Sequence, residues 1–336
     1  MTQTFEIAVI GATGTVGETL VQILEELDFP VGTLYLLAGS NSAGASVPFR
    51  GKNVRVKEVD EFDLSKAQLA FFAAGPAVTL SFAPRATAAG CSVIDLSGAL
   101  PAEQAPHVVP EANAEVLKGL KKPFQLASPS PSATNLAVVL APLRGLLDIQ
   151  RVNVTACLAV SAQGREAVSE LARQTAELLN VRPLEPQFFD RQMAFNLLAQ
   201  VGTPDAQGHT ALEKRLVHEL RAVLGLPSLK ISATCVQAPV FFGDSLTVSL
   251  QLGAAADLAA VNRALDAAPG IELVEEGDYP TAVGDAVGQD VVYVGRVRAG
   301  VDDPAELNLW LASDNVRKGA ALNAVQLAQL LIKGLA

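Results

Sequence analysis

Three glycines near the N-terminus have the spacing of a phosphate-binding turn. Gly11, Gly14 and Gly17 follow the apolar segment Phe5–Ile10 and precede the amphipathic segment Glu18–Leu24. Glycine lets the backbone turn tightly and approach a pyrophosphate, whose charge is favoured at a helix N-terminus. This order favours a dinucleotide site over a strand–turn–helix joint with incidental glycines. The expected cofactor-binding residues of this turn are Gly11, Thr13, Gly14, Thr15, Val16 and Gly17.

The loop Gly39–Ala45 should contact the adenosine ribose, because it follows a second expected strand, Val31–Ala38. An acidic residue in this loop would select NAD, and an arginine would pair with the 2′-phosphate of NADP. Neither is present. Ser40, Asn41 and Ser42 can donate hydrogen bonds to either cofactor, which gives a slight preference for NADP.

A polar turn, Ala127–Thr134 (ASPSPSAT), precedes an expected apolar helix, Asn135–Leu147. Its prolines and serines predict irregular backbone, and such a turn between a strand and a buried helix is a natural place for a nucleophile.

Three cysteines, Cys91, Cys157 and Cys235, are too few and too widely spaced for a disulfide framework or a zinc site. We expect buried free thiols and no metal.

The composition limits the classes of partner. The chain has 336 residues, enough for about two domains. A net charge of −10 disfavours binding to nucleic acid or to anionic lipid and fits metabolite chemistry better. No run of 18 apolar residues occurs, and Met1–Phe5 lacks the features of a signal peptide, so we expect a cytoplasmic protein without a membrane span.

Strands and helices alternate in the first part of the chain, which predicts a Rossmann-type, doubly wound parallel sheet. Besides the elements named above, the expected ones are the strands Gln68–Ala74 and Cys91–Asp95, the helix Val78–Ala89 and the loop Leu96–Asn113.

From Gln150 the pattern changes to an α+β domain of dimerisation or substrate-binding type. The expected strands are Val152–Ser161, Lys230–Val240, Ser245–Leu252, Val291–Val297 and Leu307–Ser313. The expected helices are Arg165–Leu179, Thr210–Leu224 and Leu258–Ala267, with an irregular stretch over Val181–Asp205. A long apolar helix, Arg317–Leu335, should return to the first domain. We therefore assign residues 1–130 and 316–336 to the dinucleotide-binding domain and 131–315 to the second.

Several short motifs are spread over nearly the whole chain. They are GATGTVG, the SAG of Ser42–Gly44, VVPEAN at Val108–Asn113, the AVS of Ala159–Ser161, PVFFG at Pro239–Gly243, YVGRVR at Tyr293–Arg298 and LWLASDNVRKGAALNAVQ at Leu309–Gln326. Together they resemble the aspartate-semialdehyde dehydrogenase family, and more specifically a Usg-type paralogue that lacks the catalytic residues. The resemblance implies a dimer that binds NADP. Members reductively dephosphorylate aspartyl phosphate in lysine, threonine and methionine biosynthesis, and their reaction needs an activated cysteine thiolate.

This chain departs from the family at the reactive positions. Pro131 stands where the resemblance places the nucleophilic cysteine, and Ser130 or Ser132 could replace it only with a base placed to take the hydroxyl proton. Asp244 stands at the position of the histidine base. With an ordinary pKa of about 4, aspartate is a poor base for a hydroxyl.

The substrate-holding positions have also changed. The family's glutamine before A-V-S corresponds to Leu158, and its two anion-binding arginines correspond to Gln237 and Pro101. Each lost cation removes about 1.5–3 kcal/mol of charge-assisted hydrogen bonding. On the expected helix Thr210–Leu224, Arg215 and Glu219 match the charged residues of the family. Leu212 stands where the resemblance places a substrate-facing acid.

We expect this chain to bind NADP more weakly than an active relative does. Gly11–Gly17 and Ser42 could still hold the nucleotide, and Asn315 resembles a family residue near the nicotinamide. The adenosine-side arginine is replaced by Asn41, which removes one phosphate contact. The remaining candidates are better explained as structural, because Cys157 should face away from Leu158, and because His107, His209 and His218 belong to no recognisable site.

Two hypotheses remain. The first is a dimeric, nucleotide-binding relative that has lost the chemistry of its family. The second is an NAD(P)-dependent oxidoreductase that reduces another carbonyl compound without a covalent thioester. Its acid–base groups would come from Ser130, Ser132, Asp244 and Arg215. The physiological ligand stays open in both.

Overall fold

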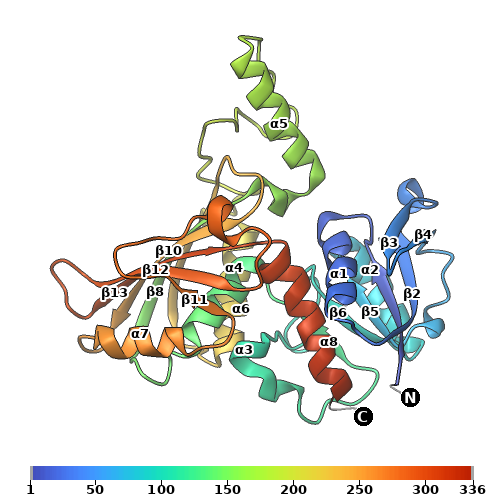
Figure 1. Ribbon diagram of the computed structural model, residues 1–336, viewed down its shortest axis with the longest axis horizontal. Helices are drawn as coiled ribbons and strands as arrows, with labels where there is room; N and C mark the ends of the chain where they lie inside the picture. The colour runs from blue at the N-terminus through green and yellow to red at the C-terminus, as the bar shows by residue number, and fades with distance from the viewer. Residues whose placement is uncertain (1–2, 334–336) are drawn as a thin grey trace. The chain divides into compact units, whose positions relative to one another are not determined.

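The computed structural model describes residues 3–333, which divide into two compact units (Figure 1). The first unit combines the chain up to Ser130 with the segment from Ala320 onward, and the second is Pro131–Gly319. The boundary expected at residue 316 therefore lies at 320. Gly319 belongs with the second unit because its Cα lies against Pro131, so close that an added Cβ would be 2.6 Å from the Pro131 Cβ.

The first unit is built on a seven-stranded sheet in the order β3-β4-β2-β1-β5-β6-β7. All neighbouring strands are parallel except the antiparallel pair β3–β4. The strands are β1 (Phe5–Ile10), β2 (Val31–Ala38), β3 (Ser46–Phe49), β4 (Lys52–Glu58), β5 (Leu69–Phe72), β6 (Ser92–Asp95) and β7 (Gln125–Ala127). This doubly wound, Rossmann-like sheet confirms the expected fold class.

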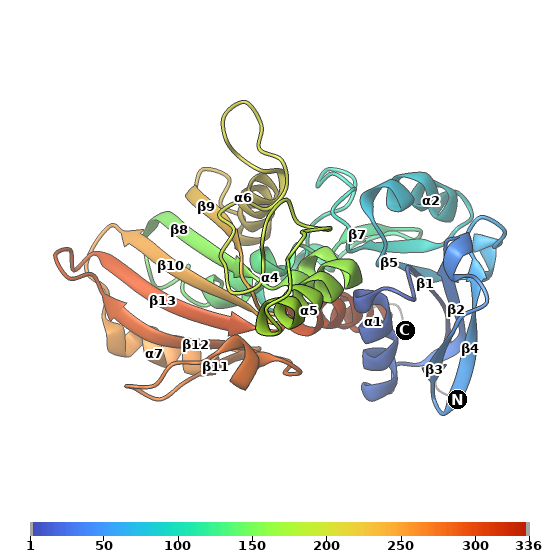
Figure 2. The same ribbon diagram turned by 90° about the horizontal axis from the view of Figure 1, so that it is seen from above.

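Helices cover both faces of this sheet (Figure 2). One apolar core joins β1 and β2 to α1 (Thr15–Glu26) and α8 (Asn323–Lys333). The other joins β5 and β6 to α2 (Pro76–Ala88). The strands carry apolar residues toward both faces, as a parallel sheet buried on both sides requires.

Three details of the first unit differ from the sequence predictions. The hairpin β3–β4 was not expected, because β4 is mostly charged and buries fully only Val56. The expected loop Leu96–Asn113 contains a short helix, α3 (Pro110–Asn113). The expected helix from Arg317 consists of a π-helix, η6 (Arg317–Leu322), followed by α8, and its last expected residues, 334 and 335, lie outside the described range.

The second unit is built on a mixed six-stranded sheet in the order β11-β12-β13-β10-β8-β9. Its strands are β8 (Ile149–Leu158), β9 (Lys230–Gln237), β10 (Asp244–Leu252), β11 (Ile271–Leu273), β12 (Val292–Ala299) and β13 (Glu306–Ser313). The pairs β8–β9 and β11–β12 are parallel and the others are antiparallel. The predicted α+β character of this domain is confirmed, although the short edge strand β11 was not expected.

Helices cover one face of this second sheet. They are α4 (Pro131–Leu140), α6 (Ala211–Leu224) and, beside β11 and β12, α7 (Leu258–Asp266). Alternate residues of β8, Val152, Val154, Ala156 and Leu158, are buried, whereas those between them face outward and are partly or fully exposed. Along β8 the second face of the sheet is therefore open in a single chain.

Helix α4 begins four residues earlier than expected, at Pro131 rather than Asn135, and it ends at Leu140. The irregular backbone predicted through Thr134 is wrong because proline at the first helical position removes only an N–H that has no intrahelical partner. All the residues of α4 after Pro131 are buried.

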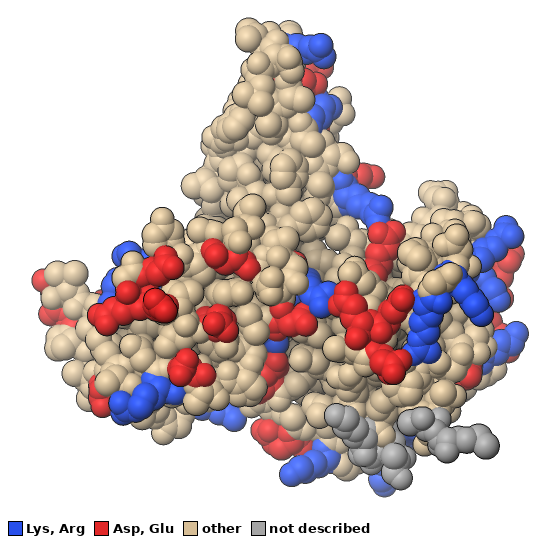
Figure 3. Space-filling model, viewed as in Figure 1, with Lys and Arg blue, Asp and Glu red and all other residues tan. Residues whose placement is uncertain are grey.

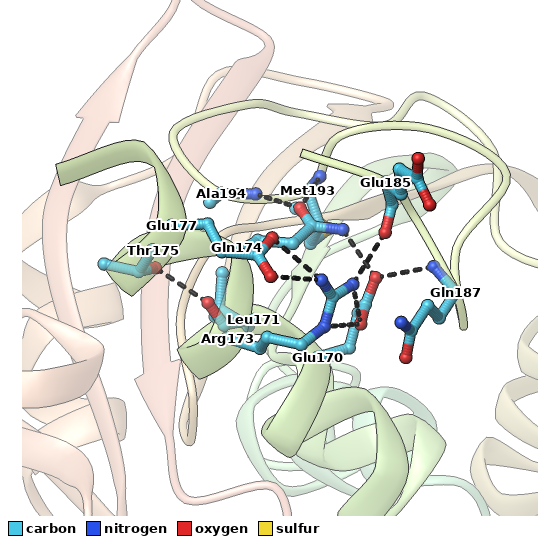
Figure 4. Close-up of polar contacts among 10 residues, drawn as sticks. All are labelled: Glu170, Leu171, Arg173, Gln174, Thr175, Glu177, Glu185, Gln187, Met193 and Ala194. Carbon is cyan, nitrogen blue, oxygen red and sulfur yellow. Dashed lines mark hydrogen bonds and ion pairs between the residues drawn. The ribbon is translucent and has the colours of Figure 1, made fainter. Parts of the chain in front are cut away.

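Helix α5 (Arg165–Leu179) and the irregular segment after it form an arm of the second unit (Figures 1 and 4). Arg173 joins Glu170 and Glu177 by ion pairs of 2.7 Å. The buried amide of Gln174 accepts hydrogen bonds from the backbone N–H of Met193 and Ala194. These polar contacts hold the loop against its helix. In the described part of the chain, no helix is both long and apolar enough to cross a bilayer.

Candidate functional site

The glycine-rich turn of the first unit has the geometry of a phosphate cradle. Gly11 has φ +85°, and a Cβ there would lie 2.7 Å from the carbonyl oxygen of Ala73. A Cβ at Gly17 would lie only 2.1 Å from the carbonyl oxygen of Gly11, so both positions require glycine. Gly14 precedes α1, and no side chain caps this helix. The first N–H groups of α1 can therefore face a phosphate, and this observation fits a dinucleotide.

The ribose-side loop follows β2, as expected, and forms a short 3-10 turn over Ser40–Ser42. Asn41 is exposed and Ser42 is half-buried. Within this turn the backbone N–H of Ser42 donates to the carbonyl of Gly39 at 3.0 Å. The residues of this turn, Ser40–Ser42, thus carry short polar side chains and no cation of their own.

The loop after β6 is organised by a buried carboxylate. Asp95 accepts hydrogen bonds from the Ser97 hydroxyl at 2.6 Å and from the backbone N–H of Ala99 and Leu100 at 3.0 and 3.1 Å. The next residue is Pro101, which is exposed and carries no polar side-chain atom. The loop is therefore well ordered at the position where the resemblance places an anion-binding arginine, yet it has nothing there to bind an anion.

The nucleophile position is the first residue of α4. The ring of Pro131 lies against the backbone of Gly319, and Ser132 beside it is almost fully buried. Ser130, which belongs to the first unit, is buried as well. One turn further along α4, Asn135 donates a hydrogen bond from Nδ2 to the Ser313 Oγ at 2.5 Å.

The second sheet gathers three of the other predicted positions, Leu158, Gln237 and Asp244, at one edge. Together with their neighbours Gln163 and Asp314 we call them the strand-edge cluster. Gln237 ends β9, Leu158 ends the parallel neighbour β8, and Asp244 begins the antiparallel β10. Gln237 donates from Nε2 to the Leu158 carbonyl at 2.7 Å, and its Oε1 accepts from Nε2 of Gln163. The amide of Gln237 therefore makes neutral hydrogen bonds within the protein where the resemblance places a guanidinium.

Asp244 is buried, and its environment changes its acidity. Its Oδ1 accepts a hydrogen bond from the backbone N–H of Ala159 at 2.9 Å. Burial raises the pKa of Asp244 to about 7, with a further upward contribution from Asp314 and an opposing one from the Ala159 hydrogen bond. The ordinary pKa assumed from sequence is therefore wrong, because removing a carboxylate from water disfavours its charged form.

The neighbouring residues Asp314 and Asn315 connect the strand ends to the loops around them. Asp314 accepts hydrogen bonds from the backbone N–H of Gly288, Val316 and Arg317, all within 2.9 Å. Asn315 accepts from the Gly243 N–H and donates to the Ser161 hydroxyl, both at 3.0 Å. Asn315 thus lies in the second unit and uses both atoms of its amide in internal hydrogen bonds.

On α6 the two charged residues that the resemblance retains, Arg215 and Glu219, are paired with each other. Arg215 donates from Nε to Glu219 at 2.7 Å, and Leu212 is half-buried beside the capping box formed by Thr210 and Glu213. The other oxygen of Glu213 accepts from the backbone N–H of Cys235 at 3.1 Å. Here too the position expected to hold a substrate-facing acid is apolar.

The thiols are poorly suited to chemistry. Burial raises the pKa of Cys91 and of Cys235 to about 12, and burial together with the nearby Asp244 raises the pKa of Cys157. A raised pKa lowers the thiolate fraction on which nucleophilicity depends. His209 and His218 are exposed, and the described residues contain no cluster of three or more metal-type side chains.

Family models match both units. Residues 6–120 match the model described as "Semialdehyde dehydrogenase, NAD binding domain", and residues 140–318 match "Semialdehyde dehydrogenase, dimerisation domain". The chain belongs to the semialdehyde dehydrogenase family.

Its relatives in this family fall into two groups. A USG-1 protein homolog from Azotobacter vinelandii is 61% identical over 333 residues, which cover 99% of each chain. An aspartate-semialdehyde dehydrogenase from a Shewanella species is 42% identical over 335 residues, again 99% of each chain. A structure from Pseudomonas aeruginosa, described as a probable aspartate-semialdehyde dehydrogenase, has a TM-score of 0.97 and 60% identity, and covers 99% of this chain and 100% of that one. The resemblance to the aspartate-semialdehyde dehydrogenase family is thereby confirmed.

Two members of the strand-edge cluster were missed from sequence. Gln163 lies in a turn after β8, and no motif marks it as the partner of Gln237. Asp314 stands inside the S-D-N motif, where only Asn315 was singled out. The signal that could have identified Asp314 is its place in the same motif as Asn315, which puts a second acid near Asp244.

Proposed function

We propose that this protein is a dimeric, NADP-binding member of the semialdehyde dehydrogenase family that does not catalyse the reductive dephosphorylation of aspartyl phosphate. The observation that carries the proposal is Pro131. It occupies the expected nucleophile position as the first residue of α4, with its ring against Gly319. A proline ring has no group that can form an acyl intermediate.

The strand-edge cluster supports the same proposal. An anionic substrate would meet the amide of Gln237, the apolar Leu158 and the buried acid Asp244. In the wild-type chain Gln237 is already bonded to Leu158 and Gln163, so it is not free to turn toward a ligand. The cluster therefore offers neither a nucleophile nor a charge that attracts a phosphate.

Complementation tests this proposal in a cell. A bacterial auxotroph that lacks its aspartate-semialdehyde dehydrogenase receives either this chain or the Shewanella relative. We expect growth without supplements only with the relative, at matched protein levels on a blot. Growth with this chain would contradict the proposal.

Binding of NADP is supported by the glycine turn of the first unit. Gly11 and Gly17 are fixed by their backbone contacts, and the uncapped start of α1 suits a pyrophosphate. Asn41 and Ser42 supply polar contacts without a cation, so we propose that the 2′-phosphate adds little affinity. We further propose that Asn315 serves mainly as an internal support, since both atoms of its amide are bonded.

Dimerisation is supported by the open face of the second sheet. Thr247 of β10 is exposed, and its register neighbours on that face are Thr155 of β8 and Trp310 of β13. Thr155 and Thr247 lie on the part of this face formed by β8 and β10. Over β13 the face is partly covered, because the Trp310 indole N–H donates to the Pro280 carbonyl at 2.8 Å and the short π-helix η5 (Ala282–Ala286) packs against β13. The family model matched by this unit is a dimerisation domain. We propose that a second copy covers the part of this face formed by β8 and β10.

A second candidate function is favoured by Asp244. With a pKa of about 7, a buried carboxyl is poised to exchange a proton near neutral pH. Such a group could serve a hydride transfer that needs no thioester, on a carbonyl compound other than the family's substrate. The test is oxidation of NADPH or NADH with a panel of uncharged aldehydes. If the wild type turns over and Asp244→Asn does not, this function replaces the proposal of a protein without activity.

A further inference from the structure

A groove of about 740 Å³ lies in the second unit beside the edge strand β11. Its walls come from α7, from the turn between Val274 and Tyr279, and from Gly295–Arg298 of β12. This volume is within the range of roughly 300–1,000 Å³ that small-ligand sites occupy. None of its lining residues belongs to the strand-edge cluster or to the glycine turn.

The strand β12 is irregular where it forms one wall. Its pairing with β11 ends at Val294, and its register with β13 shifts between Gly295 and Arg298. Arg296, inside this shift, has φ +53°, a left-handed conformation that costs strain in a residue with a side chain. Arg298 donates from Nη1 to the Arg296 carbonyl at 2.9 Å. Both arginines are exposed and line the groove.

Acidic residues complete the lining. Glu275, Glu276 and Asp278 lie in the turn, and Asp266 lies on α7. In the described part of the protein, none of these four acids and neither arginine takes part in an ion pair. Figure 3 shows acidic side chains with a few basic ones over the part of this unit where Figure 1 draws α7. Four acids against two arginines leave the groove with two excess negative charges.

We propose that this groove binds a small ligand that carries one carboxylate and a net positive charge, as a basic α-amino acid does. The carboxylate would pair with Arg296 and Arg298, whose planar guanidinium groups suit two-point recognition. The ammonium groups would meet Glu275 and Glu276, and the half-buried side chains of Val274 and Val297 would contact the aliphatic stem. β-Bulges are also common where they only prevent an exposed edge strand from pairing with another chain. If the irregularity in β12 had only that role, the groove would bind no such ligand.

The charge requirement can be tested with three probes and the intact protein. Isothermal titration calorimetry compares L-lysine with 1,5-diaminopentane, which lacks the carboxylate, and with hexanoate, which lacks both ammonium groups. We expect lysine to bind at least about tenfold more tightly than either analogue, since each loses a charge-assisted contact. Equal affinity for lysine and the diamine, or no heat of binding with any probe at about ten millimolar, would overturn the proposal.

Variants locate the site. Arg298→Gln removes one guanidinium without changing the strained position, and Glu275→Gln removes one acid. We expect each to weaken lysine binding by about three- to tenfold, the range for partly exposed charge pairs. Arg263→Gln is the matched control, because Arg263 is exposed on α7 but does not line the groove. Equal binding by all three variants, with unchanged thermal unfolding, would place the ligand elsewhere.

Discussion

Asp244 accepts a hydrogen bond from the backbone N–H of Ala159 at 2.9 Å, and the two residues join the start of β10 to the end of β8. The carboxyl group is buried, and burial raises its pKa to about 7 against the opposing effect of this hydrogen bond. In the unfolded chain the same group ionises near pH 4. Between these two values the unfolded state loses a proton that the folded state keeps.

This difference predicts how stability depends on pH. As pH rises from about 4 to about 7, the contribution of Asp244 to stability falls, because the slope follows the protons bound by each state. Asp244→Asn removes the titration but keeps an oxygen for the Ala159 N–H. We expect the variant to match the wild type near pH 4 and to exceed it by roughly 2–4 kcal/mol at pH 8.

Urea unfolding of both proteins at pH 4, 6 and 8 measures this gap. Asp285→Asn is a suitable control, because the pKa of exposed Asp285 is lowered by hydrogen bonds from Thr281 instead of raised. A constant difference between wild type and Asp244→Asn across this range would mean that Asp244 is ionised in the folded protein throughout.

The glycine turn predicts a sharp contrast between two alanine substitutions. Gly17→Ala places a Cβ 2.1 Å from the Gly11 carbonyl oxygen, so the turn must shift. We expect a loss of about 2–4 kcal/mol in the free energy of unfolding together with loss of NADPH binding. Gly145→Ala is the control, because a Cβ there meets nothing within 4 Å and Gly145 lies outside the dinucleotide-binding unit. Equal behaviour of the two variants would refute the tight geometry of the turn.

Asn41 predicts how the cofactor preference can be changed. Asn41 is exposed in the turn that follows β2, so an arginine fits there without steric conflict. We expect Asn41→Arg to raise the affinity for NADPH by about tenfold, the effect of one charge-assisted phosphate contact, and to leave NADH unchanged. Calorimetry with both cofactors measures the ratio. A wild-type protein that already binds NADPH tightly through its 2′-phosphate would contradict the weak-binding proposal.

The open sheet face predicts the effect of a charge at its centre. Thr247→Arg adds a long cation between Thr155 and Trp310. We expect the wild type to sediment as a dimer and this variant as a folded monomer, because an unpaired buried charge is costly at an interface. Ser46→Arg, at an exposed site on β3, should leave the dimer intact. A monomeric wild type would remove the basis of this prediction.

Much of the fold follows from the sequence alone because its signals are local. Apolar segments predicted most strands of both sheets, and the spacing of Gly11, Gly14 and Gly17 predicted the first turn. The hairpin β3–β4 was missed because Val56 is the only residue of β4 that becomes fully buried. The prolines and serines of Ala127–Thr134 predict irregular backbone up to Asn135, but α4 begins at Pro131, because proline is tolerated at the first helical position.

For the candidate site, the sequence predicts which residues stand at the reactive positions but not how they contact one another. Family motifs located Pro131, Leu158, Gln237 and Asp244, but not the contacts that determine their chemistry. The pairing of Gln237 with Gln163 and the raised pKa of Asp244 both depend on tertiary burial, for which one sequence has no marker. Asn315 was likewise assigned to a cofactor role without sight of its bonds to Gly243 and Ser161.

The most direct test of the inactive site is a rate measurement. Purified wild type and Pro131→Cys are mixed with aspartate semialdehyde, phosphate and NADP, and the absorbance of NADPH is followed beside the Shewanella relative. We predict no turnover above background for either, because Pro131→Cys restores a thiol but not the base or the cations at positions 244, 237 and 101. Steady production of NADPH by the wild type at a rate comparable with that of the relative would contradict the account.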